Sequence, residues 1–480
     1  MPIFEKGNEK PAHVKSVAII GGGASGAIAL DSLKKEDHFD SIVLFERRDI
    51  LGGVWCLDNP GTLTEVAHVG RTPEQADPPL ENPFRNSEAK GTILVPKTNQ
   101  YRYLETPSYP NLKTNITESL MTFSDSNSWT GEPSDETEFV DGPVVRDYIE
   151  AYILRNKSEK NVSIEYSSTI EDVERIITDN GHYYKLTIRK SSSDSHDIWY
   201  QRNFDAIVVA TGHYHVPFIP DVPGLREAQE KFPGLVKHAK YFRTPERYKD
   251  KVVVVVGTRA SGIDISRLLV GKASKVYHSR RNSQAPALKN VVPKGVIKEF
   301  KIVENQVVVV FDDNSEVVAP DHIIYGTGYQ FSYPFLNRLF AADNQVLTHD
   351  GVLVPGLYQH TFLINDPLIT FVGIPIDGVS FRVFEYQAIL VARFLAGRIT
   401  LPNVSEQELW RNDRFSKKGP SRSYHTIGAD DASDYMLELT RLGYLDKSLV
   451  VGRQFPEFSK EDLDKYLSAQ SRVFALWNIF

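Results

Sequence analysis

Three glycines near the start of the chain have the types and spacing of a site that binds the pyrophosphate of a dinucleotide. Gly21, Gly23 and Gly26 follow the apolar segment VAII and open the helix-like segment ASGAIALDSLKK. Such glycines let the turn close and the backbone approach the pyrophosphate, while the helix N-terminus supplies partial positive charge. Glu46 ends the next strand, 20 residues past Gly26, where a carboxylate binds ribose hydroxyls and repels a 2′-phosphate. This spacing predicts a site for FAD or NAD rather than NADP. The predicted contacts are Gly21, Gly22, Gly23, Ala24, Ser25, Gly26 and Glu46.

A second loop of the same kind lies about 235 residues later. Residues 257–262 read GTRASG, so Arg259 stands where the middle glycine would be. The next strand ends in Arg280 and Arg281, with no acid beside them. Guanidinium groups suit the 2′-phosphate of NADP through forked, charge-assisted hydrogen bonds, so this unit predicts an NADPH site, the alternative being a solvated pair of arginines. Arg259 either contacts the pyrophosphate or faces solvent. The predicted contacts are Ser261, Gly262, Asp264, Ser279, Arg280 and Arg281.

The elements that must position these loops form two units of strand, glycine loop, helix and strand. Two further apolar segments, DAIVVATGHY and DHIIYGTGYQ, each lead into a Thr-Gly pair and bracket the second unit. We therefore predict an α/β protein with two dinucleotide-binding, Rossmann-like domains, in which the NADPH domain is inserted into the FAD domain. The predicted limits are 1–215 for the first part of the FAD domain, 216–327 for the NADPH domain, and 328–480 for the second part of the FAD domain with the C-terminal helices.

The remaining segments carry weaker patterns. An Asn180-Gly181 turn between two strand-like segments predicts a small antiparallel meander before residue 215. Residues 58–107 are rich in Pro, Gly and polar side chains, which predicts a long irregular excursion over the surface. Apolar residues at helical spacing predict a C-terminal helix docked on the core. They are Leu463, Tyr466, Leu467, Val473, Phe474, Trp477 and Phe480.

Composition limits the partners and the compartment. The 480 residues carry a formal charge of −7, so no broad basic surface for nucleic acid or anionic lipid is expected. The single cysteine, Cys56, excludes an intrachain disulfide, a redox-active cysteine pair and a thiolate metal cage, and no other metal site is predicted. The first residues lack the apolar segment of a secretory signal, and no apolar run is long enough to span a membrane. The expected location is therefore the cytoplasm.

An FAD loop followed by an inserted NADPH loop is the layout of a two-dinucleotide flavoprotein. Such proteins differ in what receives the electrons. Disulfide reductases need a redox-active cysteine pair, which one cysteine cannot provide. Molecular oxygen, a quinone or another electron carrier remain as acceptors.

The segment before the second loop resembles the identifying sequence of flavin-containing monooxygenases. Phe232, Gly234, His238 and Phe242 spell FxGxxxHxxxF. The resemblance extends over nearly the whole chain and is strongest to soluble fungal members. Further matching segments are GGVW at 52–55, YPNLKTN at 109–115 with Met121 and Phe123, GTGY at 326–329, and HTFLINDPLITFVG at 360–373.

The resemblance implies a cycle in which NADPH reduces FAD and the reduced flavin takes up molecular oxygen as a C4a-hydroperoxide. A soft nucleophilic nitrogen or sulfur of a small molecule then attacks the distal oxygen. The protein keeps the oxygen adduct dry and hydrogen-bonded, with NADP⁺ retained over it. Asn115 matches the active-site asparagine of the family, whose amide donates and accepts hydrogen bonds without taking a proton. The resemblance also assigns cofactor contacts to Gly53, Val54, Trp55, Thr114, Asn115 and Gln387.

Two other activities stay open. Baeyer–Villiger oxygenation of a ketone is one, although its related identifying sequence usually has Trp at the position of Phe242. An uncoupled NADPH oxidase or redox-sensing flavoprotein is the other, supported only by the missing middle glycine. The sequence identifies neither the substrate nor the oligomeric state.

Several chemically suggestive residues are expected to be structural. His238, His213 and His215 lie near the predicted domain connections, where a hydrogen-bonded hinge is the favoured interpretation. Cys56 is expected to be a small buried filler.

The turn at 380–382, Ser-Phe-Arg, replaces a Pro-Phe-Pro-like turn of many relatives, which changes the expected shape of the substrate entrance.

Overall fold

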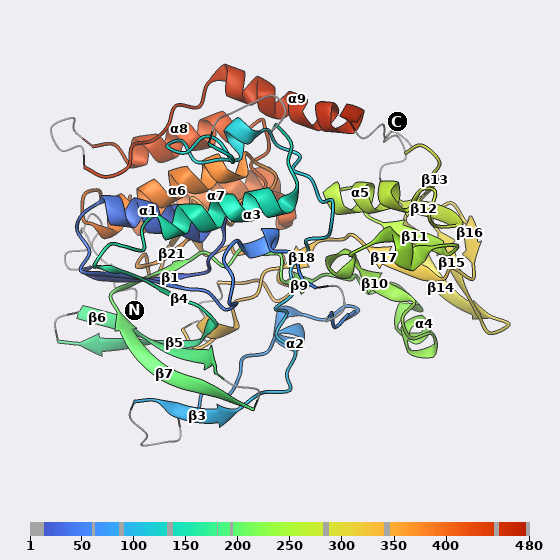
Figure 1. The fold of residues 1–480 in the computed structure, drawn as a ribbon, viewed down its shortest axis with the longest axis horizontal. Coiled ribbons are helices and arrows are strands. Elements are labelled where there is room, and N and C mark those ends of the chain that lie inside the picture. Colours follow the sequence, from blue (N-terminus) through green and yellow to red (C-terminus); the bar gives the residue numbers. More distant parts are fainter. Residues whose placement is uncertain are drawn as a thin grey trace.

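A seven-stranded sheet forms the centre of the larger part of the molecule (Figure 1). The computed structural model describes residues 14–59, 63–85, 91–131, 138–179, 181–192, 195–281, 288–339, 346–445 and 451–476. The strand order is β19-β20-β21-β8-β1-β2-β4, and β1 pairs in parallel with both β2 and β8. Its apolar strands are buried on both faces, as parallel strands usually are. The strands are β1 (Ser16–Ile20), β2 (Ser41–Phe45), β4 (Val162–Glu165), β8 (Ala206–Val209), β19 (Leu357–Tyr358), β20 (Phe362–Leu363) and β21 (Ile369–Phe371).

Helices cover one face of this sheet and a second, antiparallel sheet lies on the other side (Figure 1). The helices are α1 (Ala24–Lys35), α3 (Gly142–Leu154) and α6 (Ser380–Leu395). The antiparallel sheet has the order β3-β7-β6-β5, which confirms the predicted meander, although Asn180 lies outside the described residues. Its strands are β3 (Ile93–Pro96), β5 (Ser168–Thr178), β6 (Gly181–Ser191) and β7 (His196–Phe204).

The segment 58–107 contains two short regular elements that its composition does not predict. It contributes the edge strand β3 and the short helix α2 (Pro73–Ala76). Its side chains Asp77 and Tyr103 are buried. Most described residues of this segment nevertheless have no regular structure and are half-buried or exposed, as predicted for an irregular surface excursion. The strand β3 departs from that prediction because it pairs with β7, about 100 residues away.

A separate five-stranded parallel sheet, of order β10-β17-β11-β12-β13, lies between β8 and β21 in the sequence. This confirms the predicted α/β class with one Rossmann-like unit inserted into another. The helices α4 (Leu225–Lys231) and α5 (Ala260–Leu269) and an antiparallel sheet of β14, β15 and β16 complete the inserted unit. The strands are β10 (Val236–His238), β11 (Val252–Val256), β12 (Lys275–Ser279), β13 (Val292–Lys294), β14 (Ile297–Val303), β15 (Gln306–Phe311), β16 (Glu316–Val318) and β17 (His322–Tyr325).

The two connections between the units run side by side. The first contains β9 (Val216–Pro217) and the second β18 (Tyr329–Gln330), and these strands pair with each other. The residue after β9, Phe218, bonds the GTG segment, because its N–H donates to the Gly328 carbonyl at 2.9 Å. The chain therefore enters and leaves the inserted unit at one place.

The C-terminal region consists of helices packed on the larger unit (Figure 1). They are α7 (Val404–Lys418), α8 (Ala432–Leu442) and α9 (Lys460–Leu476). Val473 of α9 is buried, as predicted for a docked helix, whereas Leu467 is 57% exposed, contrary to the prediction. Trp477 and Phe480 lie outside the described residues. Within the described ranges, no helix has both the length and the apolar character that crossing a membrane requires.

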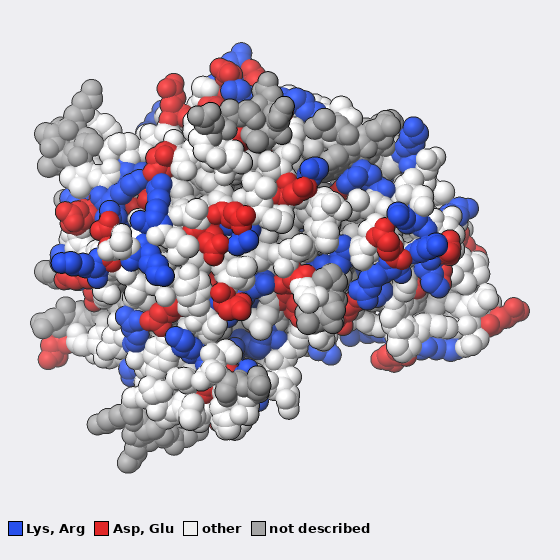
Figure 2. All heavy atoms as spheres, in the orientation of Figure 1, with Lys and Arg blue, Asp and Glu red and all other residues white. Residues whose placement is uncertain are grey.

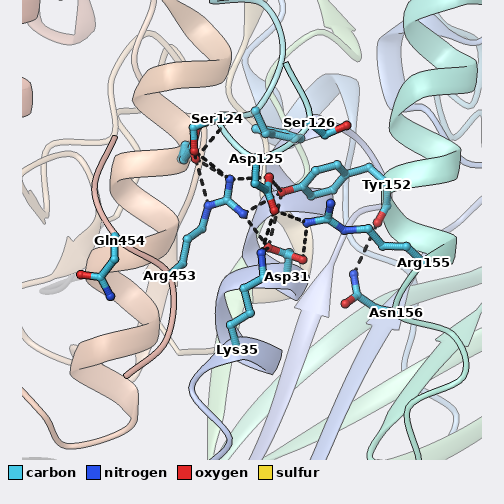
Figure 3. Close-up of polar contacts among 12 residues, drawn as sticks. Asp31, Lys35, Ser124, Asp125, Ser126, Tyr152, Arg155, Asn156, Arg453 and Gln454 are labelled. Carbon is cyan, nitrogen blue, oxygen red and sulfur yellow. Dashed lines mark hydrogen bonds and ion pairs between the residues drawn. The ribbon is translucent and has the colours of Figure 1, made fainter. Parts of the chain in front are cut away.

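Arg453, in the segment before α9, joins the three helices that cover the central sheet (Figure 3). Its Nη1 donates to Asp31 Oδ2 of α1 at 2.7 Å and to the hydroxyl of Tyr152 of α3 at 2.9 Å. Its Nε donates to Glu385 Oε1 of α6 at 2.9 Å, and its Nη2 to Asp125 Oδ1 at 2.7 Å. Burial alone would raise the pKa of Asp125, but hydrogen bonds from Arg453 and Lys35 outweigh it and lower that pKa. Asp125 therefore stays ionised, and the cluster fixes the C-terminal segment to the helices that cover the sheet.

Charges of both signs alternate over the face drawn in Figure 2. Lys and Arg side chains lie next to Asp and Glu side chains, with uncharged surface between them. Binding to nucleic acid depends on clustered basic charge. Where this face is formed by described residues, Figure 2 shows no broad basic patch of that kind.

Candidate cofactor-binding and active site

The first glycine loop has the geometry that a bound pyrophosphate requires. Gly21 has a φ of +115°, and a Cβ there would lie 2.5 Å from the Ala210 carbonyl oxygen. A Cβ on Gly26 would collide with the Gly21 carbonyl. Gly23 differs, because its φ is −90° and the nearest atom to a Cβ, Gly53 Cα, would be 3.4 Å away. The protein itself does not demand glycine at position 23, so the bare backbone there fits a ligand that approaches the start of α1.

Glu46 and the GGVW segment lie against this loop. Glu46 accepts hydrogen bonds from the N–H groups of Gly22 at 2.7 Å and Arg48 at 2.9 Å. Burial raises the pKa of Glu46, and the two backbone N–H groups partly offset that rise. The 3₁₀ turn η1 (Gly53–Trp55) follows Gly52, whose N–H donates to the Gly22 carbonyl at 2.9 Å. The structure thus brings the predicted residues Gly22, Gly53, Val54, Trp55 and Glu46 together.

Gln387 acts on this site through the backbone. Its Oε1 accepts from the Gly373 N–H at 3.0 Å, and its Nε2 donates to Thr361 Oγ1 at 2.9 Å. Gly373 has a φ of +96° and packs so closely on Ser25 that a Cβ would collide with Ser25 Oγ. Gln387 is fully buried. Its amide therefore orients the Gly373 segment, which packs against the start of α1. Ala24, the residue before Ser25, is half-buried.

Thr114 and Asn115 occupy a bend before the 3₁₀ turn η3 (Glu118–Leu120). The Thr114 N–H donates to the Val140 carbonyl at 2.9 Å, and Thr114 Oγ1 accepts from the Val140 N–H at 3.1 Å. Asn115 is exposed, and Thr117 occupies the N-cap position of the following turn. Asn115 is therefore not a helix cap, and Thr114 holds its backbone in place.

Arg382 connects this bend to α6. Its Nη1 donates to Glu385 Oε2 and its Nη2 to the Ser119 carbonyl, both at 2.9 Å. Ser380, where many relatives have the first proline, is the first residue of α6. The unusual turn at 380–382 thus begins the helix and fixes η3 to it.

The second glycine loop repeats the first despite its missing glycine. Gly257 has a φ of +117°, and a Cβ there would lie 2.5 Å from the Gly326 carbonyl oxygen. A Cβ on Gly262 would collide with the Gly257 carbonyl. Arg259 has φ −89° and ψ −178°, close to the −90° and −166° of Gly23. Since any residue adopts that conformation, the arginine leaves the backbone of the loop unchanged.

The predicted NADPH contacts divide into two groups. Ser279 Oγ donates to the Gly295 carbonyl at 2.8 Å, and Asp264 accepts from the Tyr109 hydroxyl and from Arg267 Nε, so both side chains bind the protein. Ser261 is half-buried and Gly262 is buried. Arg280 and Arg281 follow β12 directly, where Arg281 is exposed, and they are the basic groups at the end of this strand.

Two histidines accept or donate hydrogen bonds near the second loop, and only one of them was singled out from the sequence. His278 of β12, which the sequence did not single out, bonds the Gly257 carbonyl through Nε2 at 2.7 Å. His238 bonds the Gly328 carbonyl through Nε2 at 3.0 Å, and its Nδ1 accepts from the Lys240 N–H at 3.1 Å. Burial lowers the pKa of His238 to about 3. His238 is therefore a neutral residue of the connection between the units, as predicted.

The other histidines and the cysteine are also held inside the protein. His213 packs against Tyr214 and Phe331, and burial lowers its pKa to about 3. Burial likewise lowers the pKa of His215. Cys56 is buried with its thiol against the Leu51 carbonyl, and burial raises its pKa to about 12. A thiol with so high a pKa is unreactive at neutral pH.

His360 and His425 form a buried pair of rings. His425 Nε2 accepts from the Val354 N–H at 3.0 Å, so this nitrogen carries no proton. Its Nδ1 therefore donates to His360 Nδ1, 3.1 Å away. Both rings must be neutral to make these bonds, and burial lowers the pKa of both. His360 lies with Gln359 in the tight turn between β19 and β20, where both have positive φ.

We expect the free energy of unfolding to fall as the pH drops below about 6.5, the ordinary pKa of histidine. In that range the unfolded chain takes up protons that His238, His360 and His425 do not bind in the native state, so stability increases with pH. Each histidine contributes up to about 1.4 kcal/mol per pH unit, down to its folded pKa. Urea denaturation of the FAD-loaded protein on both sides of this pH measures the slope.

His425→Gln should reduce that slope, because the amide can accept from the Val354 N–H and does not titrate. His349→Gln is the matched control, since His349 is exposed. Equal slopes for the wild type and the His425 variant would contradict the assignment of neutral buried rings.

Comparison with known proteins identifies the family. Residues 19–59 match a family described as NAD(P)-binding Rossmann-like domain, 106–358 one described as pyridine nucleotide-disulphide oxidoreductase, and 287–444 one described as flavin-binding monooxygenase-like. The flavin-containing monooxygenase FMO GS-OX3 of Arabidopsis thaliana is 30% identical over 426 residues, which cover 86% of this chain and 81% of that protein. The chain belongs to the flavin-containing monooxygenase family.

Other relatives agree with this membership. The flavin-containing monooxygenase ustF2 of Aspergillus flavus is 26% identical over 456 residues, covering 86% of this chain and 88% of that protein. The solved structure of S-allyl-L-cysteine S-oxygenase from Allium sativum is 25% identical, with a TM-score of 0.71 over 96% of this chain and 93% of that one. FAD and NADPH are the cofactors of this flavin-containing monooxygenase. Molecular oxygen and a small molecule are its substrates.

Proposed function

We propose that this flavin-containing monooxygenase uses NADPH to transfer one oxygen atom to a soft nucleophilic nitrogen or sulfur of a small molecule. The observation that carries the proposal is the pair of matching glycine loops, one beside Glu46 and the other beside Arg280 and Arg281. The similarity to an S-oxygenase over nearly the full chain supports sulfur as one of the acceptors. Phe242 in the identifying sequence favours this reaction over Baeyer–Villiger oxygenation.

The residues of the first site would bind and orient FAD. The start of α1 and the bare Gly23 backbone receive the pyrophosphate. Glu46 keeps acceptor capacity for ribose hydroxyls, because a carboxylate oxygen accepts more than one hydrogen bond. Asn115, fixed through Thr114, presents a neutral amide that donates and accepts without taking a proton. Bound FAD, once reduced, supplies the activation of molecular oxygen.

We place the limits of the two domains at 1–215, 216–327 and 328–480. The strands of the first sheet lie in the outer ranges, and those of the second sheet lie in the middle range. The paired strands β9 and β18 lie at the two crossings. The proposed limits therefore cut the chain where it passes between the sheets.

The direct test is an activity screen of the purified yellow protein. NADPH should bleach the flavin absorbance in the absence of oxygen, and air should restore it. Thioethers, thiols, tertiary amines and ketones are then supplied, and products are scored for a mass gain of one oxygen atom. Oxidation of a ketone alone would assign Baeyer–Villiger activity, and NADPH oxidation that yields only hydrogen peroxide would contradict the proposed oxygenation.

We expect NADPH to be preferred over NADH because Arg280 and Arg281 bind the 2′-phosphate. Replacing both with alanine removes two charge-assisted hydrogen bonds of roughly 1.5 to 3 kcal/mol each, so the KM for NADPH should rise about a hundredfold or more. The KM for NADH should change little. Lys275→Ala, at the opposite end of β12, is the matched control and should leave both KM values unchanged. An unchanged preference in the double variant would assign the phosphate to another basic residue.

A further inference from the structure

Arg259 occupies the position in the second loop at which the dinucleotide passes closest to the backbone. In the first loop the corresponding residue, Gly23, has nearly the same φ and ψ and carries no side chain. A side chain at this position must either obstruct the pyrophosphate or bind it. Arg259 carries the charge and the forked donors that suit a phosphate.

The guanidinium of Arg259 is paired across the two units with Asp377. Asp377 lies in the segment that runs from Gly373, packed on Ser25, to the start of α6. The side chains of Arg259 and Asp377 are 64% and 44% exposed. Ion pairs between exposed groups contribute little to stability, so a dianionic pyrophosphate can displace the carboxylate at small cost.

Asp377 keeps a cationic neighbour when Arg259 leaves it. Arg422 is held by hydrogen bonding to the Tyr329 carbonyl at the second connection. Burial lowers the pKa of Arg422, and the carboxylate of Asp377 acts in the opposite direction. The charge of Asp377 therefore stays compensated in both arrangements.

We propose that Arg259 binds the pyrophosphate of NADPH in exchange for its ion pair with Asp377, so that Asp377 opposes the binding of NADPH. This inference rests on the proposed binding of NADPH at the second loop. The exchange releases the inserted unit from the segment beside the flavin site each time the dinucleotide binds. The ion pair is thus a competitor of the ligand as well as a link between the two units.

The two members of the pair should affect binding in opposite directions. With FAD-loaded protein at constant ionic strength, Arg259→Ala should raise the Kd for NADP⁺ about tenfold, by loss of one charge-assisted contact. Asp377→Asn should lower it several-fold. Asn fits the Asp377 backbone, whose φ is +53°, so this variant should fold. The Asp377 effect should vanish in the double variant, since it acts through Arg259.

Two controls separate the pyrophosphate from other charges. The ligand 2′-AMP has the 2′-phosphate but no pyrophosphate, so neither variant should change its Kd, whereas loss of Arg280 and Arg281 should. Arg226→Ala removes a comparably exposed arginine, paired with Asp221, from the same unit and should leave the Kd for NADP⁺ unchanged.

Isothermal titration calorimetry measures each Kd without turnover. A rise in Kd for both single variants would show a merely structural ion pair and overturn the inference, as would no change in either. If the wild type binds NADP⁺ and the variants give either of these two results, the inference fails and the proposed function stands. Absence of NADP⁺ binding by the wild type would contradict both.

Discussion

Replacing Asn115 with alanine should leave FAD binding and NADPH oxidation in place but reduce oxygenated product about a hundredfold. Hydrogen bonds preorganised at a reacting centre typically contribute on this scale, roughly 3 kcal/mol. Reduction of the flavin needs only that the nicotinamide be placed correctly. Transfer of oxygen also needs a site that is dry and hydrogen-bonded until the substrate arrives. Loss of the amide should therefore divert the oxygen to hydrogen peroxide.

Three quantities measured on one sample decide the role of Asn115: NADPH consumed, peroxide released and product formed. Lys113→Ala is the matched control, because Lys113 is a nearby exposed residue that pairs with Asp141 on the surface. The control should couple NADPH to product as the wild type does. Wild-type coupling in the Asn115 variant would rule out its catalytic role.

Gly23→Ala should yield folded protein that contains little flavin. The backbone of Gly23 has a φ of −90°, which alanine adopts, and the new Cβ would meet no protein atom closer than 3.4 Å. The methyl group would instead occupy the side from which the pyrophosphate approaches. Loss of two charge-assisted hydrogen bonds, at about 1.5 kcal/mol each, would weaken FAD on the order of a hundredfold.

Flavin absorbance per protein and the melting temperature of the apoprotein test this expectation together. Gly356→Ala is the matched control, since its Cβ would also come within 3.4 Å of a neighbour, Leu363 Cδ1, on the distant β19–β20 side of the sheet. Full flavin content in the Gly23 variant would falsify the assignment of this loop to FAD. An apoprotein that no longer folds would instead show that the protein, rather than the ligand, requires glycine there.

The features that the sequence predicts well are those encoded by local patterns. The strand, glycine loop and helix of each unit follow from apolar runs and from glycines whose positions are dictated by backbone contact, such as Gly26 against Gly21. The insertion follows from the order of these units along the chain. The neutral, hydrogen-bonded state expected of His238 follows from its place between the units.

The features that the sequence missed depend on residues far apart in the chain. Asp377 and Arg259 are 118 residues apart, and no spacing rule pairs them. Arg453 donates a hydrogen bond to Asp31, although the two residues are 422 positions apart in the chain. The edge strand β3 was missed because its pairing with β7, rather than its own composition, makes it a strand. Gln387 was predicted from its family position, yet only the fold shows that it acts through the Gly373 backbone.

The insertion of one sheet within another also determines the order in which the protein can fold as it is synthesised. Strand β8 ends at Val209, and its partner β21 begins at Ile369, so one edge of β8 stays unpaired while 160 residues are added. At about 5 to 20 residues per second this lasts roughly 8 to 32 s. The inserted sheet is complete at Tyr325 and can close first. The nascent flavoenzyme thus carries a finished second unit beside an open strand edge, and such an unpaired edge is a site at which strands can mispair.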